Sequence, residues 1–223
     1  MTYVRNISRI LVVGIILVLV AWLYQFANEY RYSKQAAEEV PVQSTYDIVA
    51  FGDSLVEGLG TPDLGGFVSV LEDRFDIDIF NAGTRSDTTV DLLERVHEDV
   101  LMWDPLIVIL IVGGNDVLHG VLQDTVLENL DTLFSLFQEK DITVIYGEPS
   151  FSETIWSDYA KKVKQVAEKY DNVIYVEDLL QGFFFDPRKK FDVLHPNDSG
   201  YEIMADRLEL PLCQALGICA RTE

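Results

Sequence analysis

Residues 106–116 read Leu-Ile-Val-Ile-Leu-Ile-Val-Gly-Gly-Asn-Asp, the most informative stretch of the sequence. The first seven residues are all apolar, and such a continuous run is typical of a strand buried on both faces of a parallel sheet. The two glycines end the run, and Asn115 and Asp116 follow where the strand gives way to a loop. In parallel sheets covered by helices, reactive side chains collect at such strand ends.

Similar but shorter apolar runs lie on both sides of this stretch. We expect five strands in all, at residues 47–51, 77–81, 106–112, 143–147 and 173–176. Segments with helical periodicity lie near residues 65–74, 88–102, 124–139, 154–170 and 198–209. This alternation, with right-handed crossovers, predicts an α/β fold: a three-layer α/β/α sandwich around a five-stranded parallel sheet.

The N-terminal residues 1–27 are predicted to be a transmembrane helix that anchors the chain. Residues 10–24 are an unbroken apolar run after two arginines, and Trp22 and Tyr24 suit a membrane interface. A cleaved signal peptide is the alternative, but bulky residues stand where a cleavage site needs small ones, which favours a retained anchor or uncleaved signal segment. A buried helix of a soluble domain is a third reading, which the lack of polar residues disfavours.

Residues 28–45 are polar and mixed, and we interpret them as a stalk between the anchor and a domain at residues 46–223. The positive charges before the apolar run give weak support for a cytoplasmic N-terminus. We therefore expect a single-pass membrane protein whose domain at residues 46–223 is periplasmic or extracellular.

The charge of the chain is strongly negative. It has 17 Lys and Arg against 37 Asp and Glu, a net charge of −20, and residues 1–34 hold four of the bases and one of the acids, which leaves −23 for the rest. Such a field repels polyanions, so nucleic acid is not an expected partner.

The two cysteines, Cys213 and Cys219, are six residues apart. In an oxidising compartment they could close a small disulfide loop, and otherwise they would remain two thiols. None of the three histidines is near them in sequence, so we predict no metal site and expect no cofactor.

Four short segments at predicted strand ends or in loops carry the chemistry. They are Gly-Asp-Ser-Leu at 52–55, Asn-Ala-Gly at 81–83, Gly-Gly-Asn-Asp at 113–116 and Asp-Val-Leu-His at 192–195. A serine hydroxyl needs a base to become a nucleophile, and an ester carbonyl needs hydrogen-bond donors where its oxygen becomes negative. Singly each residue has a structural explanation, such as a helix cap for Ser54, an Asx turn for Asn115 or a surface acid for Asp192.

Together and in this order, the four segments resemble those of the SGNH hydrolase superfamily, also called GDSL esterases and lipases. The resemblance covers residues 46 to about 210 and implies a flavodoxin-like α/β/α fold. Within the superfamily, the chain looks closest to the small bacterial acyl thioesterases, lysophospholipases and arylesterases, judging by Gly58-Leu59-Gly60 and by Pro196 and Asn197 after His195.

The resemblance implies a role for each residue. Ser54 is the expected nucleophile, His195 its base, and Asp192 the acid that orients the imidazole. The backbone N–H groups of Ser54 and Gly83 and the side-chain amide of Asn115 are the expected oxyanion hole. Asp53 is left out of the catalytic set, because it could simply brace its loop.

The choice of base also follows from the residues themselves. His97 lies in a charged helical stretch that indicates solvent exposure, and His119 could at best border a cleft. His195 has a carboxylate three residues earlier and Pro196 directly after it, which favours an extended backbone.

Aromatic residues after the fourth and fifth strands are candidates for an acyl pocket, with ordinary core packing as the alternative. The candidates are Phe151, Trp156, Phe183 and Phe184, with Phe185 beside them.

The sequence therefore predicts a serine ester hydrolase that cleaves acyl esters or thioesters, such as arylesters or lysophospholipids, through an acyl-enzyme on Ser54. A carbohydrate O-acetyl esterase uses the same residues and is the nearest alternative. A noncatalytic, membrane-anchored binding module is the alternative from another class.

Overall fold

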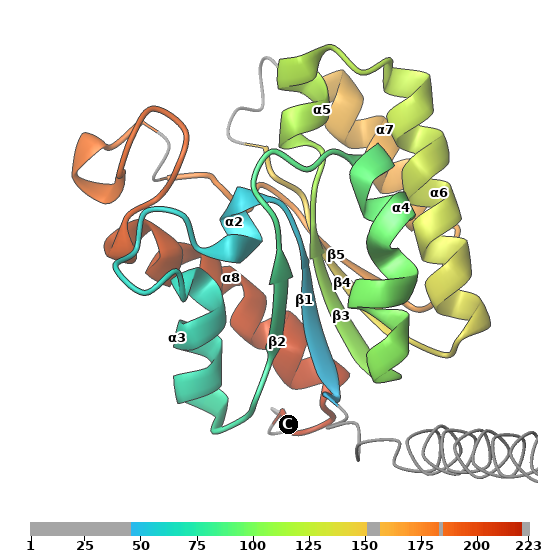
Figure 1. Cartoon of the computed structure of the whole chain (residues 1–223), viewed down its shortest axis with the longest axis horizontal. Coiled ribbons are helices and arrows are strands. Elements are labelled where there is room, and N and C mark those ends of the chain that lie inside the picture. The colour runs from blue at the N-terminus through green and yellow to red at the C-terminus, as the bar shows by residue number, and fades with distance from the viewer. Residues whose placement is uncertain (1–45, 151–156, 183–184, 220–223) are drawn as a thin grey trace, which may run out of the picture. The chain divides into compact units, whose positions relative to one another are not determined.

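The computed structural model describes residues 46–150, 157–182 and 185–219, and its centre is a five-stranded parallel sheet (Figure 1). The strands lie in the order β2-β1-β3-β4-β5. Their bounds are β1 Ile48–Gly52, β2 Phe80–Gly83, β3 Ile107–Ile111, β4 Thr143–Gly147 and β5 Val173–Val176. The predicted α/β fold with a five-stranded parallel sheet is confirmed.

The central strands are buried on both faces, as the apolar run predicts. Along β3, Ile107, Ile109 and Ile111 join the core on one face of the sheet. Val108 and Leu110 join the core on the other face. Since successive side chains of a strand point to opposite faces, a strand between two cores must be apolar at every position.

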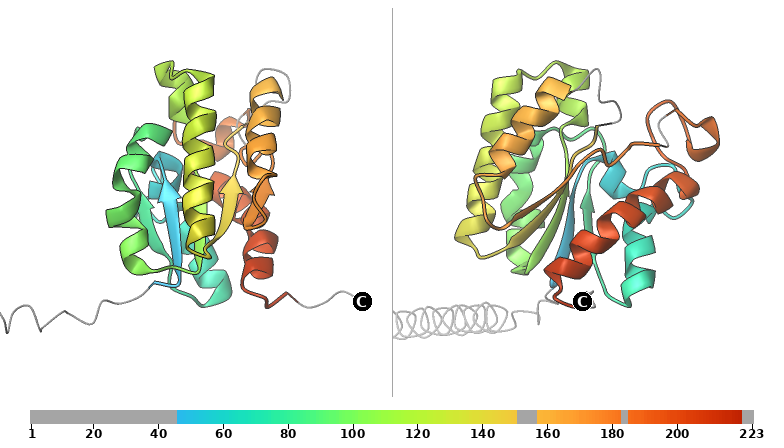
Figure 2. Two further views of the ribbon diagram at one scale, coloured as in Figure 1. Left: turned by 90° about the vertical axis from the view of Figure 1, so that its right-hand side faces the viewer. Right: turned by 180° about the vertical axis from the view of Figure 1, so that it is seen from behind.

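Helices cover both faces of the sheet (Figure 2). The first core packs against α2 Ser54–Glu57, α3 Gly66–Phe75 and α8 Asp198–Ala215. The second core packs against α4 Thr89–Asp99, α6 Gln123–Glu139 and α7 Ser157–Ala167. The remaining helices are α5 Gly114–His119 and the short 3₁₀ helices η1 Leu101–Trp103 and η2 Pro187–Lys189. The predicted three layers are present.

The second strand begins three residues later than predicted, at Phe80. Residues 77–79 do not join the sheet, because Glu72 at the end of α3 holds them instead. Its backbone carbonyl accepts a hydrogen bond from the Ile77 N–H at 3.3 Å, and its carboxylate accepts one from the Ile79 N–H at 2.9 Å. The strand then continues to Gly83, which pairs with Gly52 of β1.

The helices differ from prediction at their ends. The predicted helix at 88–102 is interrupted after Asp99 and resumes as η1, and α8 extends to Ala215 with Pro211 inside it. Two short helices, α2 and α5, were not predicted, and both begin at the strand ends that carry Ser54 and Asn115. Residues 154–156 of the predicted fourth helix lie outside the described residues.

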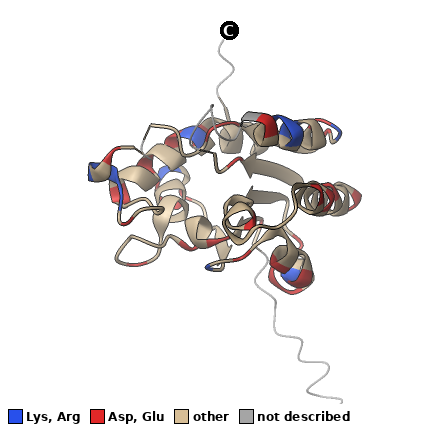
Figure 3. Cartoon of the chain, turned by 90° about the horizontal axis from the view of Figure 1, so that it is seen from above, with Lys and Arg blue, Asp and Glu red and all other residues tan. Residues whose placement is uncertain are grey.

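Cys213 and Cys219 form a disulfide at the end of α8, with their Cα atoms 5.1 Å apart. Acidic residues occur on many helices and loops of the domain, whereas basic residues are few (Figure 3). No helix within the described ranges is long and apolar enough to cross a bilayer. The predicted anchor at residues 1–27 and the predicted stalk at 28–45 lie outside those ranges.

Candidate active site

Ser54 is the first residue of α2, directly after a sharp turn at the end of β1. Gly52 has φ 159°, and a Cβ there would lie 2.0 Å from the carbonyl oxygen of Ile111, so the turn requires glycine. Asp53 caps the helix, because its carboxylate accepts a hydrogen bond from the Leu55 N–H at 2.9 Å. This turn places the Ser54 hydroxyl at the carboxyl end of the sheet, as in other parallel folds.

The hydroxyl of Ser54 contacts His195, which is 141 residues away in sequence. Ser54 Oγ and His195 Nε2 are 2.9 Å apart, a normal hydrogen-bond distance. The side chain of His195 is 17% exposed. The two groups therefore meet at a partly sheltered position that a substrate can reach.

Asp192 holds the other nitrogen of the imidazole. Its carboxylate oxygens lie 2.8 and 3.0 Å from His195 Nδ1. One of them also accepts the backbone N–H groups of Leu194 and His195, each at 2.8 Å. Burial alone would raise the pKa of Asp192, but these hydrogen bonds outweigh it and lower the pKa. An ionised Asp192 leaves Nε2 without a proton and ready to accept one from Ser54.

The other two histidines take no part in this arrangement. His97 on α4 and His119 on α5 are both exposed, and neither lines the pocket beside Ser54. The structure thus brings Ser54, Asp192 and His195 together, as the sequence predicts.

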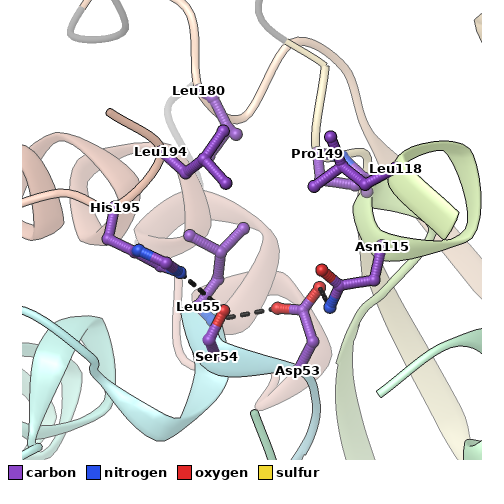
Figure 4. A pocket seen from close by; sticks show the side chains of 10 residues that line it. Asp53, Ser54, Leu55, Asn115, Leu118, Pro149, Leu180, Leu194 and His195 are labelled. Carbon is purple, nitrogen blue, oxygen red and sulfur yellow. Dashed lines mark hydrogen bonds between the residues drawn. The ribbon is translucent and has the colours of Figure 1, made fainter. Parts of the chain in front are cut away.

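Two donors of the predicted oxyanion hole lie beside the Ser54 hydroxyl. The Ser54 N–H has no protein acceptor among the residues that the structure describes. The amide nitrogen of Asn115 donates to the Asp87 carbonyl at 2.9 Å and to the Asp53 carboxylate at 3.4 Å (Figure 4), so an oxyanion would take the place of the longer of these two contacts. Asn115 is therefore held from the loop before α4, with its amide at the edge of the pocket.

The backbone N–H of Gly83, the third predicted donor, is hydrogen-bonded elsewhere. Its N–H donates to the side-chain oxygen of Asn81 at 3.0 Å, so it is not free to bind an oxyanion in this structure. A Cβ at Gly83 would lie 2.1 Å from the Glu57 nitrogen. The glycine is required because β2 packs directly against the backbone of α2, and the amide of Asn81 strengthens this contact by donating to the Val56 carbonyl at 2.8 Å.

Ser86, in the loop between β2 and α4, was not among the predicted site residues. It has φ 66°, a left-handed conformation uncommon for any residue but glycine. It precedes Asp87, whose carbonyl holds Asn115, and no acceptor for its own N–H is found in the described part of the chain. The strained backbone is the signal of a constrained position, but a serine gives no hint of it in the sequence.

Arg95 of α4 connects the end of β1 to the loop before α4. Its guanidinium donates to the Gly52 carbonyl at 2.9 Å, the Asp87 carboxylate at 2.6 Å and the Asp99 carboxylate at 2.7 Å. It also lies over the ring of Phe51, 4.5 Å from the ring centre. The end of β1 and the loop before α4 are therefore fixed to one side chain.

Two buried carboxyl groups lie next to this network. Burial raises the pKa of Asp53 to about 7; the Leu55 N–H opposes this, and the nearby Asp116 and Asp87 add to it. Burial likewise raises the pKa of Asp116, against the hydrogen bonds that Thr89 donates from its hydroxyl and its backbone N–H. Asp116 thus fastens α5, which carries Asn115, to the start of α4.

An apolar pocket opens beside the Ser54–His195 pair (Figure 4). Its polar edge is formed by Asp53, Ser54, Asn115 and His195, and its other lining residues are Leu55, Gly114, Leu118, Pro149, Leu180 and Leu194. The predicted pocket residues Phe151, Trp156, Phe183 and Phe184 lie outside the described residues. Phe185 is 77% exposed and does not line the pocket. The described lining is aliphatic.

No group of three His, Cys, Asp or Glu side chains in the described ranges could hold a metal ion.

Known proteins share both the sequence pattern and the fold. The sequence profile of the GDSL-like Lipase/Acylhydrolase family matches residues 50–203. YpmR of Bacillus subtilis (strain 168), described as uncharacterized, is 27% identical over 216 residues, which are 78% of this chain and 84% of YpmR. An arylesterase of Vibrio mimicus is 27% identical over 108 residues, which are 46% of this chain and 54% of the arylesterase.

The crystal structure of TesA is similar in fold, with a TM-score of 0.67 at 20% sequence identity. The match covers 75% of this chain and 98% of TesA.

Proposed function

This chain belongs to the GDSL-like lipase/acylhydrolase family and is an ester hydrolase, and we propose that it cleaves acyl esters or thioesters through an acyl-enzyme on Ser54. The observation that carries the proposal is the hydrogen-bonded series Ser54–His195–Asp192 at the edge of an apolar pocket. A hydroxyl with a base at 2.9 Å, itself oriented by a carboxylate, is the arrangement that nucleophilic acyl transfer needs.

The reaction begins when Ser54 Oγ attacks the ester carbonyl and His195 Nε2 takes the hydroxyl proton. Asp192 stabilises the resulting imidazolium. The negative oxygen of the tetrahedral intermediate is stabilised by the Ser54 N–H and the Asn115 amide. The Ser86 N–H, from the loop between β2 and α4, is a further backbone donor.

The imidazolium then gives its proton to the leaving alcohol or thiol, which departs and leaves the acyl group on Ser54. Water enters, His195 removes its proton, and the hydroxide equivalent attacks the acyl-enzyme carbonyl. Collapse of the second intermediate releases the carboxylic acid and returns the proton to Ser54. These steps require no group beyond the side chains and backbone donors named here.

The aliphatic pocket supports acyl esters, such as arylesters or lysophospholipids, over acetylated sugars. Leu55, Leu118, Pro149, Leu180 and Leu194 offer apolar surface to an acyl chain and few polar groups to a sugar ring. The rival activity, carbohydrate O-acetyl ester hydrolysis, would be indicated by higher kcat/KM on acetylated xylan than on p-nitrophenyl butyrate.

Residues 1–27 are proposed to anchor the enzyme in a membrane, with the catalytic domain in the periplasm or outside the cell. The apolar run of residues 10–24 supports the anchor. The Cys213–Cys219 disulfide supports an oxidising compartment. We expect that only detergent extracts the full chain from the membrane. We also expect that protease added to intact cells, after their outer membrane is permeabilised, digests the domain.

The test of the catalytic proposal is the Ser54→Ala variant. We expect it to lose turnover of p-nitrophenyl butyrate while keeping the circular dichroism spectrum and Tm of the wild type, because Ser54 contributes no core packing beyond its Cβ. Full activity in a folded Ser54→Ala variant would refute the proposal.

A further inference from the structure

Two carboxyl groups meet at one buried hydroxyl behind the pocket wall. Glu148 and Ser150 are each 3% exposed and follow β4, and Asp178 follows β5. Ser150 Oγ lies 2.5 Å from the Glu148 carboxyl group and 2.9 Å from the Asp178 carboxyl group. None of the three touches Ser54 or His195 in a hydrogen bond, so the catalytic steps above do not use them.

The hydrogen-bond inventory of this cluster favours a proton on one of its two carboxyl groups. A serine hydroxyl has one proton to donate, and an ionised carboxylate can only accept. Ser150 can donate fully to only one of the two carboxyl groups at a time, and a proton on the other carboxyl group would complete the second hydrogen bond to Ser150 Oγ. An unprotonated pair would place two negative groups against one hydroxyl in a buried site.

Glu148 is the more deeply buried of the two carboxyl groups. Burial raises its pKa, against the opposing hydrogen bonds from Ser150 and from the Asp178 N–H, whereas Asp178 is half-buried and keeps contact with solvent. The groups that face the cluster are Tyr146 of β4, Tyr159 of α7, Tyr175 of β5, Glu177 beside Asp178, and Arg207 of α8. Arg207 donates to the backbone carbonyls of Asp178 and Leu179, and its charge also attracts the Asp178 carboxylate.

The cluster joins the two chain segments that build one side of the pocket. Pro149 stands between Glu148 and Ser150, and Leu180 follows Asp178 by two residues; both line the pocket (Figure 4). The Leu180 N–H donates to the Ser150 carbonyl at 3.2 Å, and the Leu179 N–H donates to the Glu148 carbonyl at 3.0 Å. Asp178 has φ 48°, a strained conformation that needs such support.

We propose that Ser150 is a specificity-determining positioning residue, which bridges Glu148 and Asp178 and thereby holds Pro149 and Leu180 as the wall against which a medium-length acyl chain binds. The proposal rests on the function proposed above, because it assigns the acyl group to this side of the pocket. On this proposal a longer acyl chain depends on the wall more than an acetyl group does, because it offers more apolar surface to Pro149 and Leu180.

The decisive measurement is the ratio of kcat/KM for p-nitrophenyl octanoate to that for p-nitrophenyl acetate. Ser150→Ala removes the hydroxyl that joins Glu148 and Asp178, and so loosens the wall. We expect the octanoate-to-acetate ratio of kcat/KM to fall about tenfold, which is the size of the effect of losing one methylene contact. The fall should come from KM for octanoate, with kcat for acetate unchanged. A loss of stability alone would lower both rates together.

Glu148→Gln is the matched variant, because a neutral amide can donate to Ser150 and accept the Asp178 N–H without a shared proton. In the wild type we expect the ratio to fall as the pH rises and Glu148 ionises. In Glu148→Gln the ratio should stay at its wild-type low-pH level at every pH. If Ser150→Ala fails to fold, the difference in pH dependence between the wild type and Glu148→Gln still tests the proposal.

Tyr170→Phe is the control for destabilisation. It removes the hydrogen bond from the Tyr170 hydroxyl to the Asp131 carbonyl at 2.9 Å, at the opposite end of β5 from the pocket. An octanoate-to-acetate ratio that is unchanged in Ser150→Ala and independent of pH in the wild type would overturn the proposal, as would an equal loss in Tyr170→Phe.

Binding of octanamide, measured by calorimetry, separates this proposal from the proposed activity. If no ester is hydrolysed but octanamide binds about tenfold more weakly to Ser150→Ala than to the wild type, the proposed activity is refuted and the role of Ser150 in holding the pocket wall is supported. If esters are hydrolysed and neither the ratio nor octanamide binding changes, the activity stands and the role of Ser150 fails.

Discussion

Replacement of Asp192 by Ala and by Asn separates two contributions of this carboxylate to catalysis. The first is the charge that stabilises the imidazolium of His195. The second is the choice of tautomer, because the carboxylate accepts the proton of Nδ1 and so leaves Nε2 as the acceptor for Ser54.

The structure gives the size of the charge contribution. The carboxylate is 43% exposed and the imidazole 17% exposed, so the pair lies between bulk water and the interior. At a charge separation of about 4 Å, the attraction is about 1 kcal/mol in water and about 4 kcal/mol near a protein surface. An intermediate value of about 2 to 3 kcal/mol predicts a loss of roughly a hundredfold in kcat for Asp192→Ala.

Asp192→Asn should be worse, although asparagine is the closer mimic in shape. The backbone N–H groups of Leu194 and His195 both point at one oxygen of Asp192, so the amide oxygen of asparagine takes that place. The amide nitrogen then faces Nδ1 and donates to it, which moves the imidazole proton to Nε2. With the wrong tautomer added to the lost charge, we expect kcat to fall by roughly 10⁴.

The assay is steady-state hydrolysis of p-nitrophenyl butyrate at pH 7.5, with Asp186→Asn as the control. Asp186 pairs with Arg188 on the same stretch of chain but makes no contact with His195. A variant Asp192→Asn that is as active as Asp192→Ala, or more so, would refute the tautomer argument.

Three further predictions follow from the packing around Ser54. Asn115→Ala should lower kcat by about 10²- to 10³-fold, with KM for p-nitrophenyl butyrate nearly unchanged, because its amide acts on the developing oxyanion; a change confined to KM would contradict this role. Gly83→Ala should lower the free energy of unfolding by about 3 kcal/mol in urea titration, since the new Cβ meets the backbone of α2; wild-type stability would show that β2 and α2 can separate freely. Asp53 has a raised native pKa of about 7, so its ionisation opposes folding and wild-type stability should fall as the pH rises from about 4 to 7; Asp53→Asn, which keeps the helix cap, should remove this fall in urea titrations at pH 4.5 and 8, and an identical pH profile would contradict the burial argument.

Local sequence patterns predicted the parts of this molecule that depend on local rules. The apolar run at 106–112 indicates a strand between two cores because every position faces one core or the other. Asp192 and His195 were predictable because three residues of one loop bring the acid to the base. The pairing of Ser54 with His195 came from the resemblance to the SGNH superfamily, and it agrees with the rule that the carboxyl ends of parallel strands share one edge.

The errors have long-range causes. The start of β2 was wrong because a carboxylate of α3, Glu72, captures the backbone of residues 77–79, which no local pattern reveals. Gly83 was expected in the oxyanion hole because of the resemblance, and the structure shows that its missing Cβ also allows close packing against α2. The left-handed position of the same loop is Ser86, where a sequence pattern would expect glycine or asparagine.

The described pocket lining could not be predicted from composition. Leu55, Leu118, Pro149, Leu180 and Leu194 come from five separate segments, and each is an ordinary core or loop residue by itself. Only the fold brings them to one side of Ser54.

The central claim is that His195, oriented by Asp192, makes the Ser54 hydroxyl nucleophilic. The most direct measurement is covalent labelling by a fluorophosphonate, with the modified residue located by mass spectrometry in the wild type and in His195→Ala. We predict one adduct, on Ser54, in the wild type and a labelling rate lower by several orders of magnitude in the folded variant. Labelling at another residue, or equal rates in the two proteins, would contradict the account.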